Sequence, residues 1–229
     1  ALGRPNAVSV VAVAESGALY SPKHIFYTNK IATGPEAAGV IDIELSATEN
    51  IKRVAKAKKK AVEDVTVVVL DRPRHEKLIQ EIRAIGARIR LIPDGDVAGA
   101  LMTCKEDSGV DLLLGIGGSP EAVISACAIK CIGGNFQCKL WPRNQEERNR
   151  CLELGMDVDR VLYIDDLVKG ENVFFAATGV TDGELLKGVR YGGETIFTHS
   201  LVMRSKSGTI RYVEAMHRSR KLYEFSDVD

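Results

Sequence analysis

One stretch of the sequence, residues 110–134, constrains the fold more than any other. Residues 111–116 form a short apolar run of the length that a buried strand prefers. Three glycines lie within four positions at its end: Gly115, Gly117 and Gly118. Glycines spaced so closely indicate backbone that needs a positive φ or that lets another group approach closely. The stretch therefore predicts a buried strand that leads into a glycine-rich loop.

A helix is expected after the glycine loop and continues to Gly133, which can end it. Ser119 can cap its N-terminus, and Pro120 suits its first position. The free amides at such a helix start attract anions, phosphate above all. Glu121 lies in the same first turn, where an acidic side chain can simply complement the helix dipole. The stretch thus predicts a strand, a loop and a helix that together suit an anionic ligand.

The composition excludes some classes of partner. The chain has 229 residues with 31 Lys+Arg and 31 Asp+Glu, so its formal net charge is zero. A balanced chain has no general field to attract nucleic acid or an anionic membrane, and we expect neither as the main partner. No apolar run approaches the roughly 20 residues that span a bilayer. The 5 cysteines are an odd set without C-x-x-C spacing, which favours buried thiols in a cytoplasmic protein.

Three strand–loop–helix units follow one another in the middle of the chain. Residues 65–70 are a β-branched run typical of a strand covered on both faces, and residues 88–92 predict a second strand. Helices are expected at residues 76–85 and 97–103. Together with the strand at 111–116, this order predicts a parallel sheet with right-handed crossovers.

The loops after these three strands carry the candidate site, because open α/β sheets bind ligands at the carboxyl ends of their strands. The residues gathered at this edge are Arg72, Pro73, Arg74, Asp94, Gly95, Asp96, Gly117, Gly118 and Glu121. Guanidinium forks suit phosphate oxygens, whereas the two aspartates could accept hydrogen bonds from sugar hydroxyls or face a cation. Each loop also has an ordinary interpretation, as a D-G-D turn or as surface ion pairs. Convergence of all three loops favours a site for a phosphorylated ligand.

The remaining segments are expected to form a β-rich part. Residues 6–20 predict two short strands with a turn between them, and residues 24–31 predict another that carries Tyr27. Three later segments also look like strands: residues 172–177, 194–203 and 209–216. They are joined by turns too short for crossover helices, so we expect antiparallel pairing with the early strands.

This pattern predicts two domains. Residues 45–169 would be an α/β domain inserted between residues 1–44 and 170–229, which together would form the β-rich domain. Residues 46–61 predict a helix with six basic side chains, which we interpret as a solvated face. Tyr27 could donate a hydrogen bond to a phosphate, although packing against the sheet is the more common role of such a residue.

Three motifs in order carry a resemblance to a known family. D-R-P-R-H at residues 71–75, I-P-D-G-D at 92–96 and G-I-G-G-S-P-E at 115–121 resemble the class II fructose-1,6-bisphosphatases. Residues 172–181 and 207–211 share the resemblance, which covers nearly all of the chain. It implies a layered α/β/α/β/α sandwich, the fold of the lithium-sensitive sugar phosphatases. It also implies hydrolysis of the 1-phosphate of fructose 1,6-bisphosphate with Mg²⁺ or Mn²⁺, in gluconeogenesis or a related pathway, by a homo-oligomer.

The resemblance also implies roles for individual residues. Glu121 would be a metal ligand. Substrate contacts would come from Tyr27, Arg72, Pro73, Arg74, Asp94, Gly95, Asp96 and Gly118. Arg72 stands where some members of the family have Lys. The family's other acidic metal ligands, and an acid–Pro–x–Glu–Gly–Thr motif that activates water, precede the segment that this sequence covers. Since a hard divalent cation takes about six oxygens, we expect an enzyme of this kind to need that upstream segment too.

Two alternatives remain at this point. A non-catalytic sugar-phosphate-binding protein would keep the substrate loops without the metal set. A nucleotide-binding α/β domain is less favoured, because residues 115–121 lack the P-loop lysine and a G-x-G-x-x-G with a clear ribose-binding acid. The leading hypothesis is a metal-dependent sugar bisphosphatase, in which metal ions polarise the scissile phosphate and activate the attacking water.

Overall fold

A computed structural model describes residues 3–21 and 26–225 as a mixed α/β protein with two sheets. The larger sheet has the strand order β4-β3-β5-β2-β6-β7. Its strands are β2 (Tyr27–Thr33), β3 (Thr66–Leu70), β4 (Arg88–Ile92), β5 (Leu112–Gly118), β6 (Asn135–Leu140) and β7 (Val161–Tyr163). The smaller sheet contains β1 (Val8–Val13), β8 (Phe174–Gly179), β9 (Arg190–Gly192), β10 (Thr195–Arg204) and β11 (Thr209–Arg218). The described helices are α1 (Ala47–Ala57), α2 (Glu76–Ala84), α3 (Asp96–Met102), α4 (Ser119–Ile132), α5 (Gln145–Glu153), α6 (Ile164–Leu167) and α7 (Ser219–Phe225).

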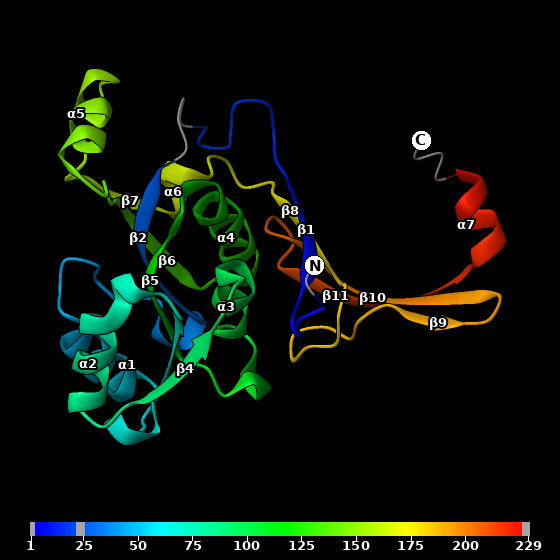
Figure 1. Ribbon diagram of the computed structural model, residues 1–229, viewed down its shortest axis with the longest axis horizontal. Helices are drawn as coiled ribbons and strands as arrows, with labels where there is room; N and C mark the ends of the chain where they lie inside the picture. Colours follow the sequence, from blue (N-terminus) through cyan, green and yellow to red (C-terminus); the bar gives the residue numbers. More distant parts are fainter. Residues whose placement is uncertain (1–2, 22–25, 226–229) are drawn as a thin grey trace.

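The elements form alternating layers of helices and sheets. In Figure 1, α1 and α2 lie on one side of the larger sheet, and α3 and α4 lie between the two sheets. This arrangement confirms the layered α/β sandwich, and the described residues supply four layers of the five that the resemblance implies. None of the described helices is long and apolar enough to cross a membrane.

Alternating side chains of the central strands build the core on both faces of the larger sheet. Val67 belongs to the same buried cluster as Ile82 of α2, whereas its neighbour Val68 belongs to the cluster on the opposite face, which includes Ala126 of α4. Successive strand residues point to opposite faces, so a β-branched run such as Thr66–Leu70 serves two helical layers at once. The far side of α3 and α4 then packs against Phe175 and other apolar side chains of the smaller sheet.

The predicted parallel unit is confirmed. Strand β3 pairs in parallel with both β4 and β5. The pairing of β1 with β8, and of β8 with β10, is antiparallel, as expected for the β-rich part. Of the two strands expected within residues 6–20, only β1 forms; the second is reduced to an isolated bridge between Leu19 and Val168. The expected strand at residues 24–31 begins at Tyr27 among the described residues, and its positions 24 and 25 lie outside them.

The placement of β2 differs from the predicted domain division. Tyr27–Thr33 was expected in the β-rich part, yet it pairs antiparallel with β5 and with β6 in the middle of the larger sheet. Strand order is a tertiary property, since a strand with one apolar face can pair in either sheet. Because β2 is antiparallel to both neighbours, β5 and β6 run in the same direction.

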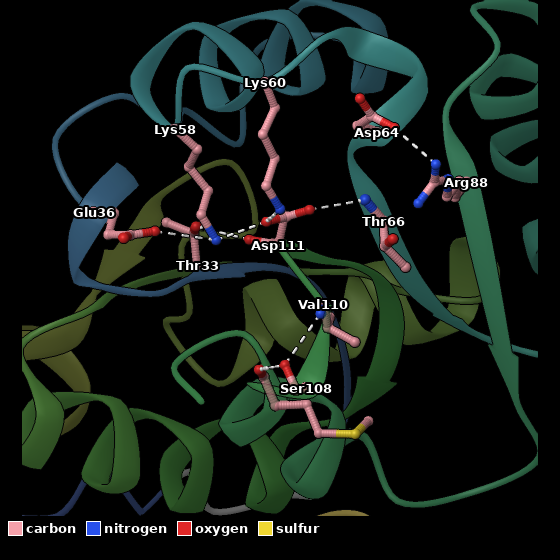
Figure 2. Close-up of polar contacts among 11 residues, drawn as sticks. Thr33, Glu36, Lys58, Lys60, Asp64, Thr66, Arg88, Ser108, Val110 and Asp111 are labelled. Carbon is pink, nitrogen blue, oxygen red and sulfur yellow. Dashed lines mark hydrogen bonds and ion pairs between the residues drawn. The ribbon is translucent and has the colours of Figure 1, made fainter. Parts of the chain in front are cut away.

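The expectation of a wholly solvated basic helix is wrong at two positions. Helix α1 ends at Ala57, and the chain turns so that the Lys58 and Lys60 ammonium groups lie 2.6 and 2.7 Å from Oδ1 of Asp111 (Figure 2). Asp111 is buried, and its Oδ2 accepts a hydrogen bond from the backbone N–H of Thr66 at 3.0 Å. These bonds outweigh the effect of burial, which works in the opposite direction, and hold the pKa of Asp111 below its usual value. The cluster fastens the amino ends of β3 and β5, opposite the candidate site.

Candidate active site at the carboxyl edge of the larger sheet

The parallel strands separate at the edge where the three loops emerge. The register between β3 and β5 ends at Val68 and Leu113, and His75 spans the gap beyond it. Its Nδ1 lies 2.7 Å from the carbonyl oxygen of Leu70, and its Nε2 accepts from the backbone N–H of Ile116 at 2.7 Å. A carbonyl only accepts and an N–H only donates, so the ring is neutral with its proton on Nδ1.

Burial is the main reason why the pKa of His75 lies below its ordinary value. The Leu70 carbonyl opposes this shift, and the charges of Arg74 and Arg72 reinforce it. Gly115 makes the bridge possible, because its φ is +139° and a Cβ there would lie 3.1 Å from Nε2 of His75. His75 therefore holds the separated ends of β3 and β5 in place.

A buried ion pair lies directly behind the glycine loop. The Lys30 ammonium is 2.6 Å from Oδ2 of Asp96, and the Lys30 side chain is only 2% exposed. A Cβ at Gly117 would collide with that carboxylate oxygen and come within 2.9 Å of the lysine nitrogen. Close approach, rather than a positive φ, is thus what requires glycine at position 117. Asp96, which the resemblance implies contacts the substrate, is the first residue of α3, and Gly95, with φ +86°, occupies the cap position.

The Arg72 and Asp94 side chains pair with each other at the surface. Nη2 of Arg72 lies 2.6 Å from Oδ1 of Asp94, and Arg4 lies 3.3 Å from the other oxygen. Arg72 and Asp94 therefore form an ordinary surface ion pair between two loops, which was the alternative interpretation of these residues. Exposed pairs of this kind contribute about 0–1 kcal/mol, so a ligand with stronger acceptors can displace them.

Arg74 points towards Tyr27 on the neighbouring strand. Its Nε and Nη2 donate to the carbonyl oxygen of Ile116 at 3.2 and 2.8 Å, which fixes the guanidinium. The guanidinium carbon lies 5.1 Å from the centre of the Tyr27 ring. Tyr27 faces Gly118 in the register between β2 and β5, so the topology brings the first and third loops together at this tyrosine.

Helix α4 begins as expected, but its cap is different. Gly118 is the cap residue and makes no side-chain cap bond, and Ser119 is the first helical residue. The Ser119 hydroxyl is buried and accepts from the backbone N–H of Phe26 at 3.2 Å, which ties the helix start to the segment before Tyr27. Glu121 is exposed, and its carboxylate lies against Gly118, where a Cβ would collide with it.

Two contributors to this edge were missed by the sequence analysis. Trp141 follows β6, and its backbone N–H donates to the carbonyl oxygen of Tyr27 at 2.8 Å. The guanidinium of Arg143 lies 5.5 Å from the centre of the Tyr27 ring. The alternation of Phe136, Cys138 and Leu140 was the available signal for β6, since these buried positions are spaced by two.

Comparison with known proteins places the chain in a family. Residues 1–217 match the family described as bacterial fructose-1,6-bisphosphatase, glpX-encoded. The chain belongs to this family. Fructose-1,6-bisphosphatase class 2 of Haemophilus influenzae is 39% identical over 241 residues, which cover 100% of this chain and 72% of the relative. Fructose-1,6-bisphosphatase 1 class 2 of Escherichia coli K12 is 39% identical over 230 residues, covering 95% of this chain and 68% of the relative.

The bacterial fructose-1,6-bisphosphatase family is metal-dependent, but the described residues do not complete a metal site. Within residues 3–21 and 26–225, no group of three or more His, Cys, Asp or Glu side chains is placed to hold a metal ion. The Asp96 and Asp94 carboxylates are engaged by Lys30 and Arg72. Glu121 offers an exposed carboxylate at this edge, which fits one oxygen ligand of the about six that Mg²⁺ requires.

The cysteines of this family member form no disulfide among the described residues. All five are free thiols, and four of them are buried. Burial raises the pKa of the Cys127 and Cys138 thiols to about 12, so both are neutral at physiological pH.

Proposed function

We propose that this protein hydrolyses the 1-phosphate of fructose 1,6-bisphosphate, giving fructose 6-phosphate and inorganic phosphate. The observation that carries the proposal is the family match over residues 1–217, which includes all three loops of the candidate site. The arrangement of these loops at one edge of the larger sheet supports it, because that edge is where open α/β sheets bind ligands.

We propose substrate-binding roles for the residues that the three loops and β2 supply. Tyr27 and Arg74 would hold a phosphate, since the guanidinium is already fixed by Ile116 and aimed at the ring. Arg72 and Asp94 would leave their surface pair to contact phosphate and sugar hydroxyls, respectively. Pro73 and Gly95 would shape their loops, and Asp96 would present its second carboxylate oxygen to the sugar.

The start of α4 would stabilise negative charge on the substrate. The Ser119 N–H donates to the carbonyl oxygen of Phe26 and Pro120 has no N–H, so the N–H groups of Glu121 and Ala122 would be the ones to bind an anion that complements the helix dipole. Preorganised donors of this kind favour the extra charge that develops on phosphate oxygens during transfer.

We propose Mn²⁺ or Mg²⁺ as the cation and Glu121 as one of its ligands. Such an ion would polarise the phosphate and lower the pKa of a bound water.

A sugar-phosphate-binding protein without catalysis is the alternative that the sequence left open. The two functions differ in a single measurable property, the release of inorganic phosphate.

The test is phosphate release from fructose 1,6-bisphosphate by the wild-type protein and Glu121→Gln, with and without Mn²⁺. We expect metal-dependent release by the wild type and a loss of at least about a hundredfold in kcat/KM for the variant, because a metal ligand is removed. Glu49→Gln is the matched control, since Glu49 also lies in the first turn of a helix. Equal activity of all three proteins would refute the ligand role, and substrate binding without release would favour the binding protein.

We further propose that the protein forms a homo-oligomer and works in the cytoplasm. The free thiols support a reducing compartment.

A further inference from the structure

A fourth strand brings a loop to the carboxyl edge of the larger sheet. Strands β5 and β6 both pair antiparallel with β2, so they run in the same direction and end at the same edge. Trp141 directly follows β6, and its ring packs edge-on against Tyr27 with 6.5 Å between the ring centres. The backbone bond from Trp141 to Tyr27 fixes where this loop begins. Arg143, two residues later, is thereby held beside the proposed phosphate site.

Two guanidinium groups lie close to the Tyr27 ring. Arg74 lies 5.1 Å and Arg143 lies 5.5 Å from its centre. Arg74 donates through Nε and Nη2 to Ile116, so these nitrogens are committed to the protein. A phosphate dianion at Tyr27 has more acceptor oxygens than the remaining edge of Arg74 can serve. A second guanidinium from the opposite loop would complete its binding.

Arg143 has a partner that a phosphate can replace. Its guanidinium pairs with the Glu147 carboxylate one helical turn away, and its side chain is 60% exposed. Exposed pairs at this spacing contribute little to stability, whereas a guanidinium binds phosphate through charge-assisted bonds of fixed geometry. Glu147 also accepts from the backbone N–H of Arg143 at 2.7 Å, so it remains held after the guanidinium has left.

We propose that Arg143 is an additional substrate-binding residue, which exchanges Glu147 for the phosphate of fructose 1,6-bisphosphate that is not hydrolysed. The assignment to this phosphate follows from charge: the cluster of Tyr27, Arg74 and Arg143 is cationic, and Glu121, proposed as a metal ligand, suits the reacting phosphate. The inference rests on the proposed function for the identity of the substrate.

Calorimetric titration of the whole protein in EDTA separates binding from turnover. The probe is fructose 1,6-bisphosphate, titrated into the wild type, Arg143→Gln and Arg148→Gln. Arg148 is the matched control, because it lies five residues after Arg143, on α5, and its substitution also removes an exposed ion pair, the one with Asp159. We expect Kd to rise about tenfold to a hundredfold for Arg143→Gln, as when a hydrogen bond to a charged group is lost. Arg148→Gln should bind within about twofold of the wild type.

Two monophosphates identify the phosphate that is bound. Fructose 6-phosphate should lose affinity in Arg143→Gln, whereas fructose 1-phosphate should bind the variant and the wild type equally. An equal loss for both monophosphates, or no loss for the bisphosphate, would overturn the inference. A loss of the same size in Arg148→Gln would also overturn it, since a general charge effect would then explain the result.

The outcomes also separate this inference from the proposed function. Binding that depends on Arg143 without phosphate release would refute the hydrolysis and leave the inference standing. Release by the wild type with unchanged binding in Arg143→Gln would refute the inference alone. Failure of the wild-type protein to bind the bisphosphate would refute both.

Discussion

The ammonium of Lys30 lies 2.6 Å from Oδ2 of Asp96, and the pair is buried behind Gly117. Lys30 comes from β2 of the larger sheet and Asp96 from the start of helix α3, so this contact joins a strand of that sheet to the helical layer beside it at the candidate site. A buried pair of this kind fixes the position of the carboxylate, because neither charge can leave for water without a penalty.

Lys30→Met should destabilise the protein strongly. It leaves the Asp96 carboxylate buried without a partner, and we expect the free energy of unfolding to fall by about 3–5 kcal/mol. Urea denaturation measures this change. The double variant Lys30→Met/Asp96→Asn should recover part of the loss, since removal of both charges is often nearly neutral. A single variant as stable as the wild type would show that the pair is not buried in solution.

Gly117→Ala should disturb the same pair from the other side. A Cβ at this position collides with the Asp96 carboxylate, and Lys30 leaves little room for that group to move. We expect a loss of about 1–3 kcal/mol in unfolding free energy, together with weaker binding of fructose 1,6-bisphosphate. Gly39→Ala is the control, because a Cβ there meets nothing within 4 Å. Equal stability of the two alanine variants would contradict the close approach.

His75 should make stability depend on pH. Its pKa is lowered in the folded protein, mainly by burial, so the unfolded chain binds the proton more readily. The contribution of His75 is therefore complete above the unfolded pKa of about 6.5 and is lost as the pH falls through the lower folded value.

The measurement is unfolding free energy from pH 8 to pH 5 for the wild type and His75→Gln. We expect the variant to lose about 1–3 kcal/mol at pH 8, because the N–H of Ile116 no longer has its acceptor. The difference between the two proteins should shrink towards pH 5. A constant difference across this range would refute the role assigned to the neutral ring.

Asp111 should stabilise the opposite edge in a different pH range. Its pKa is held below the usual value because the bonds from Lys58, Lys60 and Thr66 outweigh its burial. Its contribution is present above about pH 3.9 and is lost as the pH falls through the lower folded value.

Asp111→Asn should lower the free energy of unfolding by about 1.5–3 kcal/mol near neutral pH, the range for hydrogen bonds to a charged group. Below pH 4 the stability of this variant should depend less on pH than that of the wild type. Lys60 keeps contact with water, with 35% of its side chain exposed, which limits the loss. Asp64→Asn removes an exposed pair with Arg88, visible in the same region of Figure 2, and should cost less than about 1 kcal/mol. Denaturation of the three proteins at pH 2–7 tests this, and equal losses in both variants would contradict it.

The sequence by itself determined the local elements and the gathering of three loops. Runs such as Thr66–Leu70 encode a strand buried on both faces, and the parallel order of three such units places Arg74, Asp94 and Glu121 at one edge. These features depend on periodicity and on the handedness of crossovers, which act over short distances along the chain.

Only the tertiary structure decided which strands lie beside the site and which charges are paired. The position of β2 between β5 and β6 brings Tyr27 to Gly118 and Trp141, and it buries Lys30 against Asp96. Pairing between strands far apart in the sequence depends on the packing of both faces of the sheet. The environment of a charged side chain is also a tertiary property, because the sequence of the basic run ending in Lys60 does not show whether its side chains face water or a buried aspartate. The residues of the candidate loops could therefore be predicted from the sequence, whereas the side chains and strands that they contact could not.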